Sequence, residues 1–359
     1  RALVNDVVTL AEHLQPDALL IAGDVFDNGQ PPLTAMEVWA RALERLADAE
    51  IPVVVIPGNH DHAGRLGHLS GLTGTRGIHF RTDLASVTRP VVIGGAAIYG
   101  LPFARPAQVR SVFEQSTDDI PDRDDAAALA YLTGRAMAHH REHHPNLVPV
   151  AVAHAFVEGG GDEDDGEDPI TIGGAGAVPA TTFGDFAYVA LGHLHAPRTL
   201  EGCRVRYAGS LYPTSFAEAG RAKSATLVTL TGETVDIEEH PLIPPRPIRV
   251  LENLTFDEVL ARAPREAEEI RDAYTLVRVT DIEPIEAAIA RLRAWYPRSI
   301  LEQDRDARPG TAPGSASLES LDPRSAALAF FEHRTGDAMT EEQLAILDAA
   351  LSFELEDAP

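Results

Sequence analysis

The chain has 359 residues, a formal net charge of −25 and one cysteine. That length suffices for more than one domain, and its apolar runs are too short for a membrane span. The single cysteine, Cys203, excludes an internal disulfide, is expected to be inert and fits a cytoplasmic protein. Because phosphate binding relies on lysine and arginine, the acidic charge argues against a module that binds nucleic acid without cations or a partner. Only one of the 30 basic residues, Lys223, is a lysine, which indicates a compositional bias of the source genome.

The first half of the chain alternates predicted helices with short apolar strands. The stretch 2–14 is predicted to be a helix closed by Pro16, and Thr34 with Glu37 is typical of a capping box at the start of a second helix. Short apolar or β-branched runs predict buried strands. These runs are 18–22, 53–56, 91–99, 148–153 and 188–191, and a histidine-rich helix is predicted over 126–144.

The second half carries strand-like pieces over 206–230, and then four prolines between 241 and 247 that predict a domain boundary. A small α/β domain is predicted after them, and the Pro/Gly/Ser-rich stretch 306–317 is predicted to be a linker. Two short helices should follow, the first starting at Asp322-Pro323 and the second capped by Thr340 and Gln343. In the α/β domain, strands are predicted near 249–251, 275–280 and 299–301, and helices near 256–263, 266–272 and 285–295.

Four predicted strands end in polar residues that can bind metals. Ligands in α/β folds lie just beyond the carboxyl ends of strands, and glycines there let the backbone turn sharply. The donors are carboxylate, amide and imidazole without thiolate, a set that suits Mn, Mg, Fe or Zn. The strands 19–22, 53–56, 150–153 and 188–191 are followed by Gly-Asp-Val-Phe-Asp, Pro-Gly-Asn-His-Asp, His and Gly-His-Leu-His.

This order of motifs resembles the signature of the calcineurin-like metallophosphoesterases, and further stretches resemble the SbcD family of nuclease subunits within them. The resemblance covers nearly the whole chain and is weakest over 249–318. It implies an α/β fold with a four-layer metallophosphoesterase β-sandwich flanked by helices, a small α/β cap domain and a C-terminal helix pair. The further stretches are Ala153-His154-Ala155-Phe156, Tyr207-Ala208-Gly209-Ser210, and Ser215-Phe216-Ala217-Glu218 followed by Lys223-Ser224.

The resemblance implies two divalent metal ions, manganese before magnesium. Asp24 would bridge both ions, Asn59, His154 and His193 would bind the second, and His195 would bind the first. Two ions about 3.5–4 Å apart can hold a hydroxide and clamp a phosphodiester for in-line displacement. Fixed cations and a nearby imidazole then stabilise the negative charge of the transition state.

Three further residues receive supporting roles from the resemblance. His60 would meet the phosphate or protonate the leaving oxygen, and Asp61 would help to hold His60. Asp27 would orient the metal ligands by hydrogen bonding. For Asp24, Asn59, His60 and His193, the alternative is ordinary turn chemistry at strand ends, where Asp, Asn and Gly are common. For His154 it is a core or surface histidine, and for His195 a surface loop residue.

The same resemblance implies four segments. We expect a nuclease domain over 1–243, a capping domain over 247–304, a linker over 305–320 and a helical partner-binding tail over 321–355. Compared with the family pattern, the chain starts after the first strand and the Asp-x-His motif, which supply two ligands of the first metal. We therefore expect the nuclease domain to lack both, because Asp6 and His13 lie on a predicted helix and cannot replace them.

By resemblance, the function is hydrolysis of DNA phosphodiesters in recombination and repair. The activities would be an ATP-dependent 3′→5′ exonuclease on double strands and an endonuclease on single strands and hairpins. The partners would be DNA, which the cap helps to admit, and the SbcC ATPase, whose coiled coil the tail would grip, with a homodimer inside a heterotetramer and no membrane. Two alternatives are a phosphoesterase for cyclic nucleotides or phosphoproteins, and a scaffold that binds SbcC and DNA without cutting.

Several other patterns have a plain interpretation beside a functional one. For the four histidines of the predicted helix, a solvated face is favoured over a metal tract, and the acidic stretch 162–168 is expected to be a solvated loop. Met36, Trp39 and Leu43 suit a dimer face or core packing. The apolar tail favours a partner over packing back on the domain. The residues concerned are His139, His140, His143 and His144, and in the tail Leu328, Phe330, Phe331, Leu344, Leu347 and Leu351.

Overall fold

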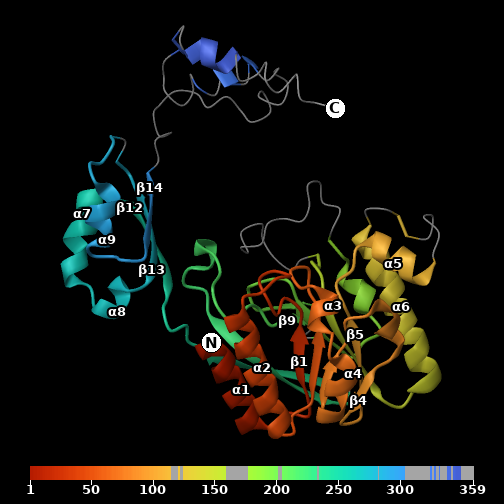
Figure 1. Ribbon diagram of the computed structural model, residues 1–359. Coiled ribbons are helices and arrows are strands. Elements are labelled where there is room, and N and C mark those ends of the chain that lie inside the picture. Colours follow the sequence, from red (N-terminus) through yellow and green to blue (C-terminus); the bar gives the residue numbers. More distant parts are fainter. Residues whose placement is uncertain are drawn as a thin grey trace. The chain divides into compact units, whose positions relative to one another are not determined.

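The computed structural model describes residues 1–114, 120–121, 124–158, 177–200, 204–232, 234–281 and 283–303, with short pieces between 324 and 348. Contacts divide the chain into two compact units, Arg1–Arg249 and Val250–Pro359, which we describe separately (Figure 1). The division lies just beyond the proline-rich stretch 241–247. Cys203, the acidic stretch 162–168, the linker 305–320, Asp322-Pro323, Phe330 and Leu351 lie outside the described residues.

The first unit is built on two sheets. The smaller sheet is parallel, with the order β1-β2-β3. The larger has the order β4-β5-β6-β7-β9-β8 and is parallel from β5 to β9, with antiparallel strands at both edges. The strands are β1 (Leu19–Ala22), β2 (Val53–Ile56), β3 (Ile78–Phe80), β4 (Val91–Ile93), β5 (Ala96–Leu101), β6 (Val148–His154), β7 (Tyr188–Gly192), β8 (Arg198–Leu200) and β9 (Val205–Tyr207).

The alternation of side chains along the strands divides the core into layers. In β2, Val54 and Ile56 pack in the core shared by the two sheets, whereas Val53 and Val55 face the helices. Strand β6 alternates in the same way between the shared core and a second helix-covered core. Each sheet is therefore buried on both faces, which is why its strands are almost wholly apolar.

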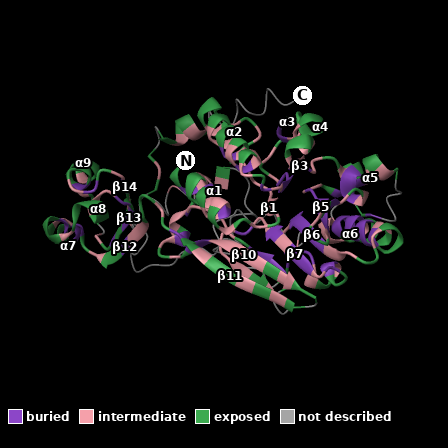
Figure 2. Cartoon of the chain, turned by 90° about the horizontal axis from the view of Figure 1, so that it is seen from below, coloured by how far each residue is buried: buried purple, intermediate pink, exposed green. Residues whose placement is uncertain are grey.

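Helices cover the outer face of each sheet (Figures 1 and 2). Apolar residues of α1 (Ala2–Leu14) and α2 (Leu33–Asp48) pack against the smaller sheet, and those of α5 (Pro106–Phe113) and α6 (Asp125–His143) pack against the larger one. The order helix, sheet, sheet, helix confirms the predicted four-layer α/β sandwich. Shorter elements connect these layers: α3 (Ala63–Leu66), α4 (Ser70–Thr73), η1 (Gly74–Arg76), η2 (Leu84–Thr88), η3 (Ala180–Phe183) and η5 (Phe216–Glu218).

A long hairpin of β10 (Lys223–Thr231) and β11 (Thr234–Leu242) follows the larger sheet. Its residues Val228, Leu230 and Val235 pack against the shared core. The buried Arg206 of β9 is tied to the hairpin by an ion pair with Glu239 and a hydrogen bond to Thr226.

The second unit contains a small three-stranded sheet with helices beside it. The sheet has the order β12-β13-β14, with β13 and β14 parallel. Helix α7 begins with a capping box, in which Thr255 and Glu258 each accept from the other's backbone N–H. The elements are β12 (Ile248–Leu254), α7 (Phe256–Arg262), η6 (Ala263–Arg265), α8 (Glu268–Arg271), β13 (Tyr274–Val279), α9 (Ala288–Arg293) and β14 (Ser299–Gln303).

Two predictions about helices were wrong. Helix α2 begins at Leu33 with Pro32 at its N-cap and no capping hydrogen bond from a side chain, so Thr34 and Glu37 do not form a capping box. His140 is 5% exposed and lies among the core residues of α6, so the four histidines are not all on a solvated face. The helix starts ahead of Thr34 because Pro32 is its N-cap, and His140 is buried because it packs beside Tyr99.

The tail is described only in pieces. Thr340 and Gln343 cap each other as predicted, with N–O distances of 2.9 and 3.3 Å. Arg324 pairs with Asp348 through two hydrogen bonds of 2.5 and 3.1 Å, and this joins the two helical pieces. The apolar residues Leu328, Phe331, Leu344 and Leu347 are half-buried, and Ile346 is 71% exposed. Among the described residues, none of the helices is both long and apolar enough to cross a membrane.

Candidate metal centre and active site

The four predicted strand ends meet at one place between the two sheets. Strands β1 and β2 run parallel in the smaller sheet, and β6 and β7 run parallel in the larger one. Strand β1 contacts both β6 and β7. The loops that follow all four strands therefore deliver their side chains to a common edge, as expected for parallel strands.

The close approach of these loops depends on glycine. A Cβ on Gly58 would lie 2.1 Å from Oδ1 of Asp24, and one on Gly192 would lie 1.8 Å from the carbonyl oxygen of Ala22. Real Cβ atoms do not come this close to backbone, so only glycine fits at either position. The glycines of the motifs thus bring the backbone of one strand end against that of the next.

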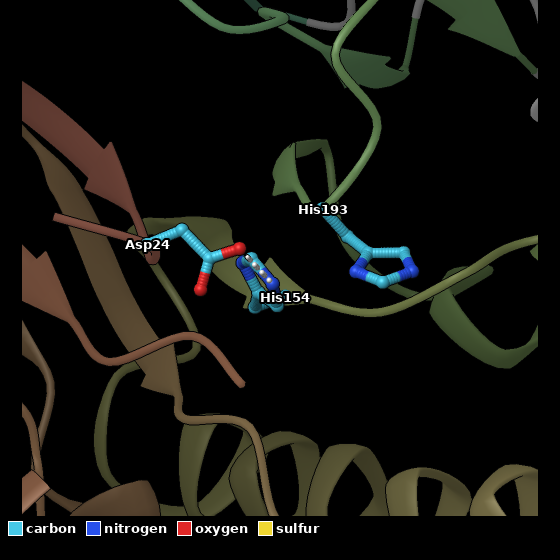
Figure 3. A group of neighbouring side chains, drawn as sticks. All are labelled: Asp24, His154 and His193. Carbon is cyan, nitrogen blue, oxygen red and sulfur yellow. Dashed lines mark ion pairs between the residues drawn. The ribbon is translucent and has the colours of Figure 1, made fainter. Parts of the chain in front are cut away.

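Asp24, His154 and His193 form a compact group whose ligand atoms lie within 4.8 Å of one another (Figure 3). Nε2 of His154 is 3.1 Å from a carboxylate oxygen of Asp24. Oδ1 of Asn59 lies 2.8 Å from the same Nε2 and 3.3 Å from Nδ1 of His193. The structure therefore brings together four of the five predicted metal ligands, while His195 is outside this group.

The protonation of His154 makes this group suitable for a cation. Its Nδ1 lies 2.8 Å from the carbonyl oxygen of Ala22, which can only accept, so Nδ1 carries the proton. With Nδ1 protonated, Nε2 is the ring atom that faces the oxygens of Asp24 and Asn59. In a site where His154 is 3% exposed, these oxygens and Nε2 need a positive charge between them, which either a proton or a metal ion supplies. The donor set fits a divalent metal.

Charge and backbone geometry support the same interpretation. Burial alone would raise the pKa of Asp24, but the hydrogen bond and charge of His154, together with His60, hold it below its ordinary value. Asp24 therefore remains a carboxylate. Asp24 and His193 also have positive φ angles of 48° and 107°, an uncommon backbone state for residues other than glycine that often marks functional sites.

His60 lies beside this group and is exposed. Its backbone N–H donates to Oδ1 of Asp24 at 3.1 Å, and its ring Nδ1 donates to the carbonyl oxygen of Asp27 at 2.9 Å. Asp27 therefore orients His60 through its backbone. The predicted hydrogen bonding of the Asp27 side chain to metal ligands stays a prediction.

The carboxylate of Asp61 points at backbone amides. It accepts from the N–H groups of Val25, Phe26 and Gly58 at 3.0 to 3.1 Å. Burial raises the pKa of Asp61, and these hydrogen bonds lower it only in part. Asp61 thus joins the loop after β1 to the loop after β2, and its predicted support of His60 stays a prediction.

Glu218 contacts His195 and is a residue to which the sequence pattern assigned no role. Oε1 of Glu218 lies 3.1 Å from Nδ1 of His195, and the carboxylate also pairs with Lys223, which is itself buried. Burial would raise the pKa of Glu218, but hydrogen bonds from His195 and Lys223 and the charge of Lys223 lower it to about 2. The motif that contains Glu218 and Lys223 was visible in the sequence, but its contact with His195 was not.

Two aromatic rings that were also assigned no role lie beside the metal ligands. Phe103 meets His154 edge-on at 6.2 Å between ring centres, and Phe156 meets His193 at 6.3 Å. They limit the space open to each imidazole. Phe156 belongs to the Ala-His-Ala-Phe motif, whereas nothing in the sequence around Phe103 indicates its position.

Comparison with known proteins agrees with this geometry. Residues 1–197 match the calcineurin-like phosphoesterase family, and residues 244–335 match the type 5 capsule protein repressor C-terminal domain, SbcD_C. The chain is 31% identical to the SbcD subunit of the nuclease SbcCD from Bacillus subtilis (strain 168), over 99% of this chain and 93% of that protein. This chain belongs to the SbcD family of calcineurin-like phosphoesterases.

Membership of the SbcD family makes the chain a hydrolase of phosphodiester bonds, in a family whose enzymes use divalent metals. Solved structures add little. Thermus thermophilus TT1561 covers 66% of this chain and 92% of its own, with 12% identity and a TM-score of 0.39. A family 1 β-glucosidase from Thermotoga maritima reaches a TM-score of 0.20 at 12% identity, covering 77% of this chain and 65% of its own. Neither likeness is close enough to support an inference.

Proposed function

We propose that this chain is a two-metal DNA nuclease that acts with an SbcC-type ATPase. Its activities would be an ATP-dependent 3′→5′ exonuclease on double strands and an endonuclease on single strands and hairpins, in recombination and repair. The observation that carries the proposal is the convergence of ligand atoms from Asp24, Asn59 and His154 beside the exposed residue His60.

The ligand residues divide between two ions, for which manganese is our first choice and magnesium our second. Asn59, His154 and His193 would hold one ion, Asp24 would touch both, and His195 would serve the other. When bound, the ions would supply positive charge for the phosphate and activation of the attacking water. Within this chain, Asp24 and His195 represent the first metal site.

His60 would hold the proton that the leaving oxygen needs. Its Nδ1 is committed to the carbonyl oxygen of Asp27, which fixes the ring, so Nε2 is the ring atom that would carry this proton. Because its backbone N–H also binds Asp24, the position of His60 is linked to the metal centre. A general acid placed in this way typically contributes about 10²–10⁴ in rate.

Binding of DNA needs help beyond this chain. A net charge of −25 repels phosphates, so bound cations and a partner must supply the attraction. A cavity of about 360 Å³ has no carboxylate among its lining residues. Its lining residues are Asn28, Gly29, Gln30, His62 and Arg65.

We assign the nuclease domain to 1–243, the capping domain to 247–304, a linker to 305–320 and the partner-binding tail to 321–355. The exposed Ile346 and the half-buried Leu344 and Leu347 give the tail an apolar face for the ATPase partner. The relative from B. subtilis is named as a subunit of SbcCD, which supports a complex here. A homodimer of this chain within that complex and a cytoplasmic location complete the proposal.

Manganese-dependent cleavage of a DNA hairpin by His60→Ala, with and without the ATPase partner, tests this function. We expect a loss of about 10²–10⁴ in rate with manganese binding retained, because the ring of His60 is not among the ligands. His143→Ala is the matched control, since His143 is an exposed histidine on α6.

Three outcomes would contradict the proposal. Equal cleavage by His60→Ala and the parent would remove His60 from the mechanism. Cleavage of a cyclic nucleotide or phosphoprotein but not of DNA would establish another phosphoesterase. Partner binding without cleavage, even with an Asp-x-His segment added before Arg1, would establish a scaffold.

A further inference from the structure

The only lysine of the chain is buried in the first unit. Lys223 is 2% exposed, and 29 of the 30 basic residues are arginine. A buried ammonium is tolerated only when its charge and its three N–H groups are all satisfied. In a chain that uses arginine elsewhere, the lysine at this position needs a local reason.

The contacts of Lys223 give that reason. Its Nζ donates to the carbonyl oxygen of His195 at 2.7 Å, to Oγ of Ser210 at 2.8 Å and to the carboxylate of Glu218. Three acceptors surround a compact tetrahedral donor, so every N–H is used. The larger, planar guanidinium of arginine cannot reproduce this geometry.

Glu218 completes the contact from the other side. The side chain of Glu218 is fully buried, and its Oε1 lies 3.1 Å from Nδ1 of His195. The same oxygen accepts hydrogen bonds from the backbone N–H and the hydroxyl of Thr214, at 3.2 and 3.0 Å. The Thr214 hydroxyl also lies 3.0 Å from Nδ1 of His195, but its proton goes to Oε1 of Glu218. Because a carboxylate only accepts, Nδ1 of His195 carries the proton between them. The pair therefore holds His195 twice, by the backbone carbonyl through Lys223 and by the ring through Glu218.

We propose that Glu218 and Lys223 are positioning residues that fix the orientation and tautomer of His195, so that its Nε2 presents a lone pair to a divalent cation. The cation rests on the proposed function, whereas the tautomer does not. A pair that served only to fill the core could be replaced by apolar side chains at little cost in stability. Lys223 contacts the backbone of His195 and Glu218 contacts its ring, and these two contacts to one residue favour a positioning role.

Nitrogen-15 NMR of histidine-labelled, metal-free protein at pH 8 tests the tautomer directly. The ring signals of His195 are assigned through His195→Gln. We expect a protonated Nδ1 and an unprotonated Nε2 in the parent chain. A proton on Nε2 in the parent would overturn the proposal without any need for a variant to fold.

Glu218→Gln sharpens the test. Lys223 would hold the amide oxygen, so the NH₂ group would face His195 and Nδ1 would have to accept. We expect the proton to move to Nε2, and His195 to need about 10–100-fold more Mn²⁺ for broadening of its signals. Lys223→Arg should weaken Mn²⁺ binding at His195 in the same direction. The control is Glu239→Gln, which alters the ion pair with the buried Arg206, away from His195.

The signals of His154 separate this inference from the proposed function. Broadening of His154 by Mn²⁺ should be unchanged in Glu218→Gln, because its contacts are to Ala22, Asn59 and Asp24. If Mn²⁺ fails to broaden His154 in the parent, the metal centre itself is wrong. If His154 broadens normally and His195 keeps its tautomer and Mn²⁺ response in Glu218→Gln, the positioning role is wrong.

Discussion

Gly58 has no room for a side chain, because the carboxylate of Asp24 occupies the position of its missing Cβ. The backbone N–H of Gly58 also binds Asp61, which in turn holds the loop after β1. The position of Asp24 thus depends on the absence of a side chain at Gly58 as much as on its own contacts.

Gly58→Ala should displace Asp24 and lower activity by about 10²-fold, the usual loss for a misplacement of about 1 Å in a catalytic group. Manganese affinity should fall with it, as measured by titration. Gly134→Ala is the control, since a Cβ on Gly134 in α6 meets nothing within 4 Å. That change should leave cleavage intact and stabilise the helix by up to about 1 kcal/mol. Normal manganese binding in Gly58→Ala would contradict this account.

For single residues, the sequence predicted which side chains lie in the site, but it did not predict all of their contacts. Asp24, Asn59, His154 and His193 were placed together because strand ends and glycines are visible in a linear pattern. The amide contacts of Asp61 and the pairing of His195 with Glu218 were not foreseen. They join loops far apart in the chain, and no local pattern encodes which loop a side chain will face.

Helix α6 carries a buried histidine in its last turn. His140 lies edge-on to Tyr99 at 5.9 Å between ring centres, and its Nδ1 is buried with no hydrogen-bond partner among the described residues. Burial, assisted by the charge of His144, lowers the pKa of His140 below its usual 6.5. The unfolded chain therefore takes up a proton at this residue at a higher pH than the folded chain does.

The sign of this pKa shift predicts acid sensitivity. The parent chain should lose stability as the pH falls below 6.5, and His140→Leu should lose less over the same range. Urea unfolding at pH 8 and at pH 5.5 measures both chains, and the difference between them isolates His140 from other groups. Equal losses of stability in the parent and in His140→Leu would contradict this prediction, because protonation of His140 would then not destabilise the folded chain.

The elements foreseen from the sequence are those with long, one-sided or continuous apolar patterns. Strands β2, β6 and β7 and helix α1 were predicted within one or two residues. Strand β3, of three residues, and β11, which contains Pro241, were missed because their burial comes from neighbouring strands. The predicted cap of α2 was wrong because the N-cap residue is Pro32, two residues before Thr34.

For the whole molecule, the metal centre couples binding to stability. Asp24, Asn59 and His154 present their ligand atoms to one point only in the folded unit, so a metal that binds there stabilises the folded form over the unfolded one. At a metal concentration of about 100 times the Kd, binding adds about 2.7 kcal/mol. A rise of roughly 2–4 °C per kcal/mol is expected in a unit of this size.

Calorimetry with manganese and then with excess EDTA measures this effect. The transition of the first unit should rise with the metal and return with the chelator, whereas that of the second unit should not move. Asn59→Leu should remove the response. A response that is equal in both transitions, or that persists in Asn59→Leu, would place the metal elsewhere.

The position of the site between two sheets also sets an order of events during synthesis. Asp24 and Asn59 leave the ribosome long before His154 and His193, and the loops meet only once β6 and β7 have joined the sandwich. Closing so long a stretch of chain is slow, since non-local contacts gain nothing until the ends meet. On the proposed assignment of the metal ligands, a chain that ends before β7 would lack a complete metal site and so could not cut DNA.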